Sequence, residues 1–219
     1  TALGLTDIRN FIDGLGGNDS LRGGALNDTI FGGLGNDSID GGLGDDTINA
    51  GDNDDRVIDA GGAVSINGGS GTDTFDASGR TQNGTINLGV GTAYGGSLLN
   101  FEHAIGGSGN ELISGNGLGN RLDGGGGNDI LFGNSGNDTL VGNLGDNFFL
   151  PGDGVDSIVG SVGFDAVFYG DAPAAITLNL ATGVHTGFAQ NDVFSGINAF
   201  LMTPFGDRVT GVDNGATGD

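Results

Sequence analysis

The sequence predicts an all-β protein: a parallel β-roll made of two stacks of nonapeptide repeats that are joined by β-hairpin linkers. Three observations carry this prediction. Large apolar residues recur with a spacing of nine, aspartate stands two positions before most of them, and 50 of the 219 residues are glycine. So much glycine, combined with regularly placed apolar residues, indicates a periodic fold.

The apolar residues define the strands. Two runs of seven positions are filled without exception, by Leu21, Ile30, Ile39, Ile48, Val57, Ile66 and Phe75, and then by Ile113, Leu122, Leu131, Leu140, Phe149, Ile158 and Val167. Because side chains alternate between the two faces of a strand, the middle residue of a three-residue strand faces one way and its neighbours face the other. Each repeat therefore predicts one short strand with one inward side chain.

The residues before each strand define the turns. The position two before each apolar residue holds Asp19, Asp28, Asp37, Asp46, Asp55, Val64 and Asp73 in the first run, and Glu111, Asn120, Asp129, Asp138, Asn147, Asp156 and Asp165 in the second. Glycine fills most of the preceding positions, as in residues 32–40, which read GGLGNDSID. Gly, Asn and Asp favour tight turns with positive φ. One turn and one strand thus form half a coil.

Two such halves close a coil, and successive coils stack in parallel about 4.8 Å apart through strand hydrogen bonds. Each coil buries only two large side chains, whereas ordering the backbone costs roughly 1–2 kcal/mol per residue. The turns alternate sides, so each carboxylate approaches that of the repeat two positions later. Two such anions repel unless a cation lies between them. Calcium, with about six to eight oxygen ligands, suits this gap.

The nonapeptides at residues 32–40 and 41–49, GGLGNDSID and GGLGDDTIN, resemble the repeat of the repeats-in-toxin (RTX) family. The resemblance implies several Ca²⁺ ions, each held by two carboxylates and four backbone carbonyls. It implies as ligands the side chains of Asp19, Asp28, Asp37, Asp46, Asp55, Asp73, Glu111, Asn120, Asp129, Asp138, Asn147, Asp156 and Asp165, together with turn glycines Gly24, Gly33, Gly35, Gly42, Gly44, Gly125, Gly127 and Gly136.

The predicted sites differ in charge. Six have two acidic partners, namely Asp19/Asp37, Asp37/Asp55, Asp55/Asp73, Asp28/Asp46, Glu111/Asp129 and Asp138/Asp156. Three have one neutral amide and are expected to bind more weakly, namely Asn120/Asp138, Asp129/Asn147 and Asn147/Asp165. The Asp46/Val64 pair is expected to bind poorly, and the turns of repeats 50–58 and 59–67 depart from the pattern.

The period is interrupted twice. Residues 77–105 and 169–205 contain the related segments TINL and TLNL, which lie 92 residues apart, and their alternating apolar residues predict β-hairpins. The predicted organisation is the end of a preceding linker (1–13), a first RTX β-roll (14–76), a first linker (77–105), a second RTX β-roll (106–168), a second linker (169–205) and the start of a further repeat block (206–219).

Alternate strands of the second roll are apolar on their outer side as well, around Leu131, Phe149 and Val167. Phe132, Phe148 and Phe168 are among these outer residues. A sheet that is apolar on both faces should be covered. We expect either a linker hairpin or a partner to lie over it.

Composition excludes several function classes. Acidic residues outnumber basic ones by 28 to 6, and the net charge of -22 argues against nucleic acid and against insertion into an anionic membrane. Cysteine is absent, which excludes disulfides and thiolate metal sites. His103 and His185 both lie in linkers, and no nucleophile or phosphate-binding motif is present. The sequence therefore predicts no enzyme, no catalytic residues and no organic cofactor.

The RTX resemblance implies export through a type I secretion channel and folding on Ca²⁺ outside the cell. We expect a calcium-binding repeat region of a secreted bacterial protein, extracellular or at the cell surface, that serves as a structural, surface or secretion-folding module, as in adhesins and S-layer proteins. Neighbouring repeat modules or surface polysaccharide are the expected partners. A carbohydrate-binding module of a polysaccharide-modifying enzyme is the alternative, and an ice-binding adhesin segment is less favoured.

Overall fold

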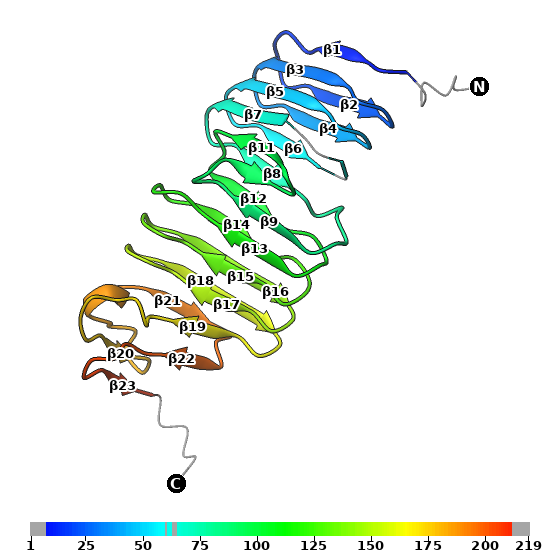
Figure 1. Cartoon of the computed structure of the whole chain (residues 1–219). Helices are drawn as coiled ribbons and strands as arrows, with labels where there is room; N and C mark the ends of the chain where they lie inside the picture. The colour runs from blue at the N-terminus through cyan, green and yellow to red at the C-terminus, as the bar shows by residue number, and fades with distance from the viewer. Residues whose placement is uncertain (1–7, 60, 63–64, 212–219) are drawn as a thin grey trace.

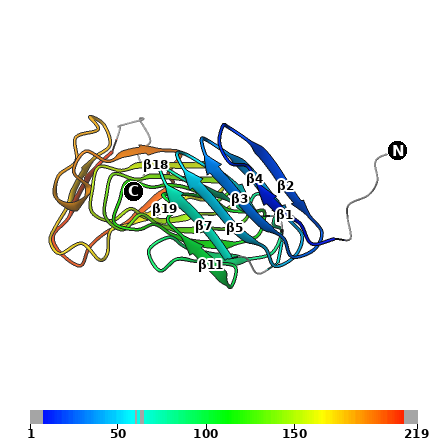
Figure 2. The same cartoon turned by 90° about the horizontal axis from the view of Figure 1, so that it is seen from above.

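The computed structural model describes residues 8–59, 61–62 and 65–211. Two long sheets of mainly parallel strands face each other and form one elongated stack (Figure 1, Figure 2). The helical structure of these residues is limited to the 3-10 turn η1 (Gly187–Ala189). Among the same residues, no helix has the length and apolar character needed to span a bilayer. The predicted all-β class and parallel β-roll are confirmed.

The chain alternates between the sheets, so each coil contributes one strand to each. Sheet A contains, in spatial order, β1 (Phe11–Asp13), β3 (Thr29–Leu34), β5 (Thr47–Asp52), β7 (Ser65–Ser70), β11 (Gly96–Leu99), β10 (Thr92–Ala93), β9 (Gly84–Asn87), β13 (Glu111–Ser114), β15 (Ile130–Phe132), β17 (Phe148–Leu150), β19 (Ala166–Phe168) and β22 (Ala199–Leu201). Sheet B contains β2 (Ser20–Gly24), β4 (Ser38–Gly42), β6 (Arg56–Ile58), β8 (Thr74–Asp76), β12 (His103–Ile105), β14 (Arg121–Asp123), β16 (Thr139–Leu144), β18 (Ser157–Val162) and β21 (Val193–Ser195).

The register of the repeats stacks like residues on like. Ile30 pairs with Ile48 and Ile48 with Ile66 across β3, β5 and β7. All the predicted inward residues except Leu21 are at most 2% exposed, and Leu21 is partly buried. The core is therefore a narrow column of apolar side chains, two from each coil, as the spacing of nine predicts.

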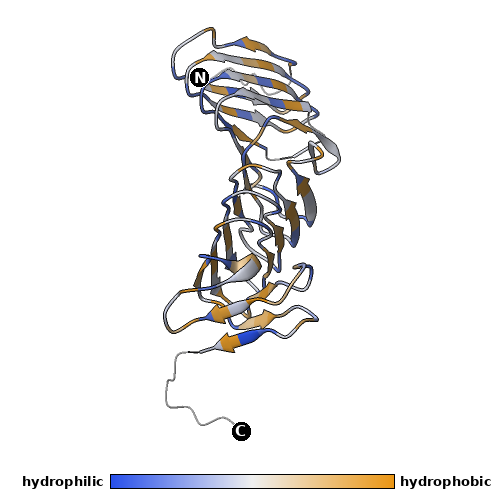
Figure 3. Ribbon diagram, turned by 90° about the vertical axis from the view of Figure 1, so that its left-hand side faces the viewer, coloured by the Kyte–Doolittle hydropathy of each residue, from blue (hydrophilic) through white to orange (hydrophobic). Residues whose placement is uncertain are grey.

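The first linker continues the stack and bends it. Strands β9, β10 and β11 form an antiparallel meander inside sheet A, whereas β12 alone joins sheet B. Because sheet A gains three strands where sheet B gains one, the two rolls meet at an angle, which Figure 3 shows as a change of direction between them. The predicted hairpin pairing is thus present, but as part of the stack.

The second linker contains less antiparallel strand pairing than the first. Strands β21 and β22 extend the two sheets in parallel, while β20 (Thr177–Asn179) pairs in parallel with β23 (Arg208–Thr210) in a separate small sheet. Antiparallel pairing among the described residues of this linker is limited to the bridge between Thr177 and Thr186. The β-hairpin predicted here is therefore not extended into a ladder, because β20 takes its partner from further along the chain.

The outer apolar residues around Leu131, Phe149 and Val167 lie on sheet A, in β15, β17 and β19. Phe188 of the second linker lies beside Phe132 and Leu150 at one edge of this face. Ile130 remains 39% exposed, whereas Phe148 and Phe168 are half-buried and stack with ring centroids 5.8 Å apart. The linker therefore covers one edge of the apolar face and leaves the rest open.

Candidate metal sites

Each repeat turn places its acidic side chain against the backbone of the neighbouring coil. The Asp37 N–H donates to Oδ1 of Asp55, and the Asp55 N–H donates to Oδ1 of Asp73, both at 2.8 Å. The same contact joins Asp19 to Asp37, Asp28 to Asp46, Glu111 to Asp129 and Asp138 to Asp156. The structure therefore brings together the members of all six acidic pairs that the sequence indicates.

The second oxygen of most of these carboxylates has no hydrogen-bond donor. The buried, unpartnered atoms are Oδ2 of Asp19, Asp28, Asp37, Asp55, Asp73, Asp129, Asp138, Asp156 and Asp165, and Oε1 of Glu111. Asp37 is 3% exposed and Asp73 is fully buried, so water cannot readily supply the missing donors. Because a buried charge without a partner is costly, a column of such oxygens favours a bound cation.

Backbone carbonyl oxygens converge on the same free carboxylate oxygens. A Cβ on Gly32 would lie within 3.0 Å of both the Ala50 carbonyl oxygen and Oδ2 of Asp37, and Gly23 is placed in the same way against Gly41 and Asp28. Only glycine fits these positions, because its neighbours are fixed backbone and carboxylate atoms. A backbone carbonyl oxygen and a free carboxylate oxygen thus lie close to the same point, with no side chain between them.

The turn glycines predicted as ligands share one conformation. Gly24, Gly33, Gly35, Gly42, Gly44, Gly125, Gly127 and Gly136 all have positive φ. At two of these positions the carbonyl is already used between coils, since Gly24 accepts the Leu43 N–H at 2.8 Å and Gly125 accepts the Leu144 N–H at 3.1 Å. The carbonyls that face the free carboxylate oxygens belong instead to the first residue of each repeat, which the sequence did not single out.

Burial raises the pKa of six of the ladder carboxylates, and neighbouring carboxylates raise it further at most of these six. The pKa rises to about 6 for Asp46, Asp55, Asp73 and Asp138, and to about 7 for Asp129 and Asp156. The backbone N–H at Oδ1 opposes this rise but does not cancel it. Such carboxylates lack positive neighbours, and a divalent cation supplies that charge.

Calcium fits this donor set. Within residues 8–59, 61–62 and 65–211, no three His, Cys, Asp or Glu side chains gather in one group. Each site can therefore draw on two stacked carboxylates, and the remaining ligands would be neutral oxygens such as backbone carbonyls. Calcium accepts mixed shells of carboxylate and carbonyl oxygen, whereas zinc and the softer metals favour nitrogen or sulfur.

In the ladders of stacked turn side chains, two positions, called rungs here, carry a neutral amide in place of a carboxylate. Asn147 donates from Nδ2 to Oδ1 of Asp165 at 3.0 Å, and Asn120 donates from Nδ2 to the carbonyl of Glu102 at 2.8 Å. Both side chains still accept a backbone N–H or present an oxygen to the turn. These amide groups supply hydrogen bonds where the other rungs offer bare oxygen, in keeping with the weaker binding expected there. Val64 lies outside the described residues.

Sequence reasoning missed members of the acidic ladders that lie in the linkers. The Asp73 N–H donates to Glu102 at 2.8 Å, the Asp156 N–H to Asp192 at 2.9 Å, and the Asp165 N–H to Asn198 at 2.8 Å. Each stands two positions before an inward residue, as in the repeats. The similarity between residues 101–106 and 197–202, which aligns Glu102 with Asn198, was the available signal.

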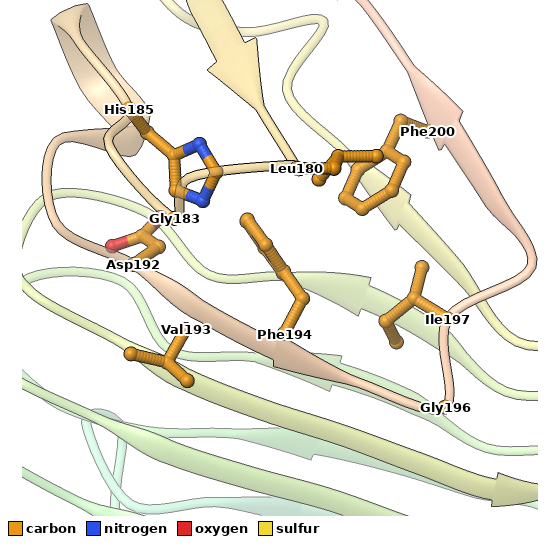
Figure 4. Close-up of a pocket in the computed structure, with 9 residues that line it drawn as sticks. All are labelled: Leu180, Gly183, His185, Asp192, Val193, Phe194, Gly196, Ile197 and Phe200. Atoms are coloured by element: carbon orange, nitrogen blue, oxygen red, sulfur yellow. The ribbon is translucent and has the colours of Figure 1, made fainter. Parts of the chain in front are cut away.

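A cavity in the second linker holds a histidine and an aspartate. This cavity, of about 280 Å³, is lined by His185, Asp192 and Phe194 (Figure 4). Nδ1 of His185 accepts the Asn179 N–H at 3.0 Å, its ring lies 5.1 Å from that of Phe194, and burial lowers its pKa. The Tyr169 hydroxyl donates to Oδ2 of Asp192 at 2.5 Å. The His185 ring and the Asp192 carboxylate are thus both held by contacts within the linker.

Comparison with known families identifies one match. The family described as RTX calcium-binding nonapeptide repeat (4 copies) matches residues 13–48, 22–57, 49–79, 105–140 and 114–149. These overlapping segments cover both β-rolls up to β17 and leave residues 80–104 unmatched. Comparison with curated proteins finds no matching relative.

Proposed function

The chain belongs to the family of RTX calcium-binding nonapeptide repeats, and from that premise we propose that it is a secreted bacterial module that folds on Ca²⁺ outside the cell. The acidic ladders of the two rolls hold the ions. The observation that carries this proposal is the column of buried carboxylate oxygens without any donor. A calcium-binding repeat is a structural element, and we propose no enzymatic activity for these residues.

The bound ion supplies positive charge and closes the oxygen shell. The chain's own residues do the rest. Stacked carboxylates such as those of Asp37 and Asp55 orient their free oxygens inward, because Oδ1 is held by a backbone N–H of the coil before. Glycine at the first position of most repeats leaves room for the carbonyl oxygens. Folding and binding are therefore one event, and the binding free energy is folding free energy.

The same coupling suits export. With a net charge of -22 and two large core residues per coil, the chain should stay open where calcium is scarce, since its carboxylates repel one another. An open chain can pass through a narrow secretion channel, and calcium outside the cell then closes it. The folded stack serves as a rigid structural or surface module, with neighbouring repeat modules as its nearest partners.

Circular dichroism of the chain during a calcium titration tests this proposal. We expect little β-structure after exhaustive chelation, cooperative β-formation on adding Ca²⁺, and much weaker formation on adding Mg²⁺, which resists dehydration and demands a tighter octahedral shell. Asp13→Asn, which removes one exposed charge outside the ladders, is titrated as a control and should fold over the same calcium range as the unmodified chain. An unchanged β-spectrum after complete calcium removal would reject the proposal.

One observation favours the carbohydrate-binding alternative as a second candidate. Arg56, Thr74, His103 and Arg121 form a continuous row across four neighbouring strands of sheet B. The side chains of Arg56 and Arg121, 51% and 52% exposed, pair with Asp76 and Asp123, of which Asp76 is fully buried, so this face presents mainly hydrogen-bond donors. Such a surface matches the hydroxyl groups of a polysaccharide better than a scattered set of arginines would.

A glycan array tests this second candidate. We expect the calcium-loaded chain to bind a polysaccharide that Arg56→Gln and Arg121→Gln each weaken, whereas Arg208→Gln on β23 leaves binding unchanged. Equal binding by all variants, or no binding by the folded chain, would leave sheet B without a carbohydrate role and would not affect the calcium proposal.

A further inference from the structure

The edge of the stack where the chain passes from sheet A to sheet B carries an acidic ladder that continues beyond the repeats. In the first roll this A-to-B edge is formed by Asp19, Asp37, Asp55 and Asp73. The next rung is Glu102 of the first linker, 29 residues after Asp73. The family match ends at residue 79 and resumes at residue 105, so Glu102 lies outside the matched repeats.

Glu102 occupies the same register position over Asp73 that Asp73 occupies over Asp55. The backbone N–H groups of Glu102 and His103 donate to the Asp73 carbonyl at 3.2 and 3.0 Å, and the Asp73 N–H donates to Oε2 of Glu102 at 2.8 Å. Strand β12 pairs with β8 as β8 pairs with β6. The turn before Glu102 is shorter than a repeat turn, and the extra methylene of glutamate gives its carboxylate more reach.

The oxygens around Asp73 are arranged as in a repeat site. Asp73 is fully buried, and its Oδ2 has no hydrogen-bond partner. A Cβ on Gly68 would lie within 3.0 Å of both this Oδ2 and the Asn100 carbonyl oxygen, as Gly32 is placed against Asp37 and Ala50. Asn100 has φ 57, a left-handed conformation that is uncommon outside glycine. This residue therefore provides the carbonyl that the first position of a repeat provides elsewhere.

A hollow lies beside Glu102. This hollow, of about 430 Å³, is lined by Asn100, Phe101 and Glu102 from the linker and by the turn at residues 116–118. Glu102 is only half-buried. An unpartnered carboxylate oxygen, a second carboxylate and a bare carbonyl oxygen thus meet beside an opening to solvent.

We propose that Asp73 and Glu102, with the carbonyl oxygen of Asn100, hold a Ca²⁺ ion that joins the first β-roll to the first linker. This site rests on the proposed calcium function and extends it to a segment without nonapeptides. The ion couples the linker to the first roll, so that the bend between the rolls becomes ordered only when calcium is bound.

The number of ions bound by the full chain tests this site. Glu102→Gln keeps an oxygen for the Asp73 N–H and removes only the charge, so we expect its chain to fold in Ca²⁺ and to bind one ion fewer in equilibrium dialysis. Asp13→Asn should bind the wild-type number. Wild-type stoichiometry and affinity in Glu102→Gln would overturn the inference, whereas a wild-type chain that binds no calcium would instead reject the proposed function.

A second measurement uses the unmodified chain, in case Glu102→Gln does not fold. Hydrogen exchange should show the amides of Asp73, Glu102 and His103 becoming protected over the same calcium range as those of Asp37 and Asp55. Linker amides that are already protected in chelator, or that stay unprotected when the repeat amides are saturated, would overturn the site.

Discussion

Buried carboxylates fall into two groups in this molecule. In the repeat turns, as at Asp37, one oxygen is buried without any donor. In the turn that begins at Asp59, the carboxylate is 2% exposed and both its oxygens are held by the guanidinium of Arg80, with contacts of 2.9 to 3.2 Å. The same guanidinium donates to the Gly62 carbonyl at 2.6 Å and lies 4.3 Å from the ring centroid of Tyr94.

The difference between these two kinds of turn indicates what a bound calcium ion would contribute to the repeat turns. Arg80 brings to one turn a fixed positive charge, which donates both to the carboxylate and to a backbone carbonyl. The repeat turns lack these interactions. With 6 arginines against 28 acidic residues, the chain cannot supply such a partner to every turn. On the proposed function, ions from solution supply the positive charge at the other turns. The turn at Asp59 should therefore be insensitive to calcium, and the repeat turns should depend on it.

Removing the internal cation should have the largest effect. Arg80→Met leaves Asp59 buried without its partner, and breaking such a pair from one side costs about 3–5 kcal/mol. We expect urea unfolding in saturating calcium to show this loss. Arg22→Met is the control, because the Arg22 side chain is 79% exposed and its 3.3 Å contact with Asp40 should contribute about 0–1 kcal/mol. Equal losses in both variants would contradict the special role of Arg80.

Removing one ladder charge should have the next largest effect. Asp37→Asn keeps an oxygen for the Asp19 N–H but weakens the two sites that share Asp37. Because calcium affinity follows the charge of the ligands, we expect the calcium midpoint of folding to rise on the order of tenfold. Asp40→Asn, on the outer face of strand β4 that follows Asp37, should leave the midpoint unchanged. A ladder variant that folds at the wild-type calcium concentration would contradict the assignment.

The pH dependence should separate the metal-free fold from the calcium-loaded one. Asp129 and Asp156 have folded pKa values of about 7, above the ordinary value of 3.8. A raised folded pKa stabilises the metal-free fold below about pH 4, and this contribution is lost as pH rises through about 7. Calcium competes with the same protons.

We therefore expect the calcium midpoint to rise as the pH is lowered from about 7 to about 5, the range set by these raised pKa values. Calcium titrations followed by circular dichroism at several pH values measure this shift. A midpoint that stays constant across the range, or that falls at lower pH, would show that the buried carboxylates are not the ligands.

Replacing a neutral amide of the ladders by a carboxylate should have the smallest effect on calcium binding. Asn147→Asp exchanges an amide that donates to Asp165 for a second carboxylate, so it adds charge to the sites with Asp129 and Asp165. We expect calcium binding to tighten by a few fold and the metal-free chain to become less ordered. Calorimetric titration measures the first change. Weaker calcium binding than in the wild type would show that the amide is itself the preferred ligand.

The repeated part of the fold could be predicted because its period is constant. Inward residues such as Ile48 and ladder acids such as Asp37 recur at a fixed interval, and stacking two coils requires only that interval. The turn carbonyls could not be assigned, because all turn glycines look alike in sequence. Only the structure shows that the carbonyl of Ala50 faces Asp37 while that of Gly24 bonds Leu43.

The linkers escaped prediction because their connections differ in length. Rungs in the repeats are 18 residues apart, whereas Glu102, Asp192 and Asn198 follow their partners by 29, 36 and 33 residues. The buried pair of Arg80 with Asp59 spans 21 residues and matches no period. A search for a fixed spacing finds neither the linker members of the ladders nor this buried pair. The reason is that meander strands such as β9 to β11 lengthen the chain between two turns without changing how those turns stack.

Anomalous scattering from crystals grown in calcium tests most directly whether metal ions stabilise the stacked turns. We expect calcium peaks between Asp37 and Asp55 and between Asp138 and Asp156, each about 2.3–2.6 Å from a carboxylate oxygen, and no peak beside Arg80. Stacked turns without metal between them, with the carboxylates directed into solvent, would contradict calcium as the element that holds this fold together.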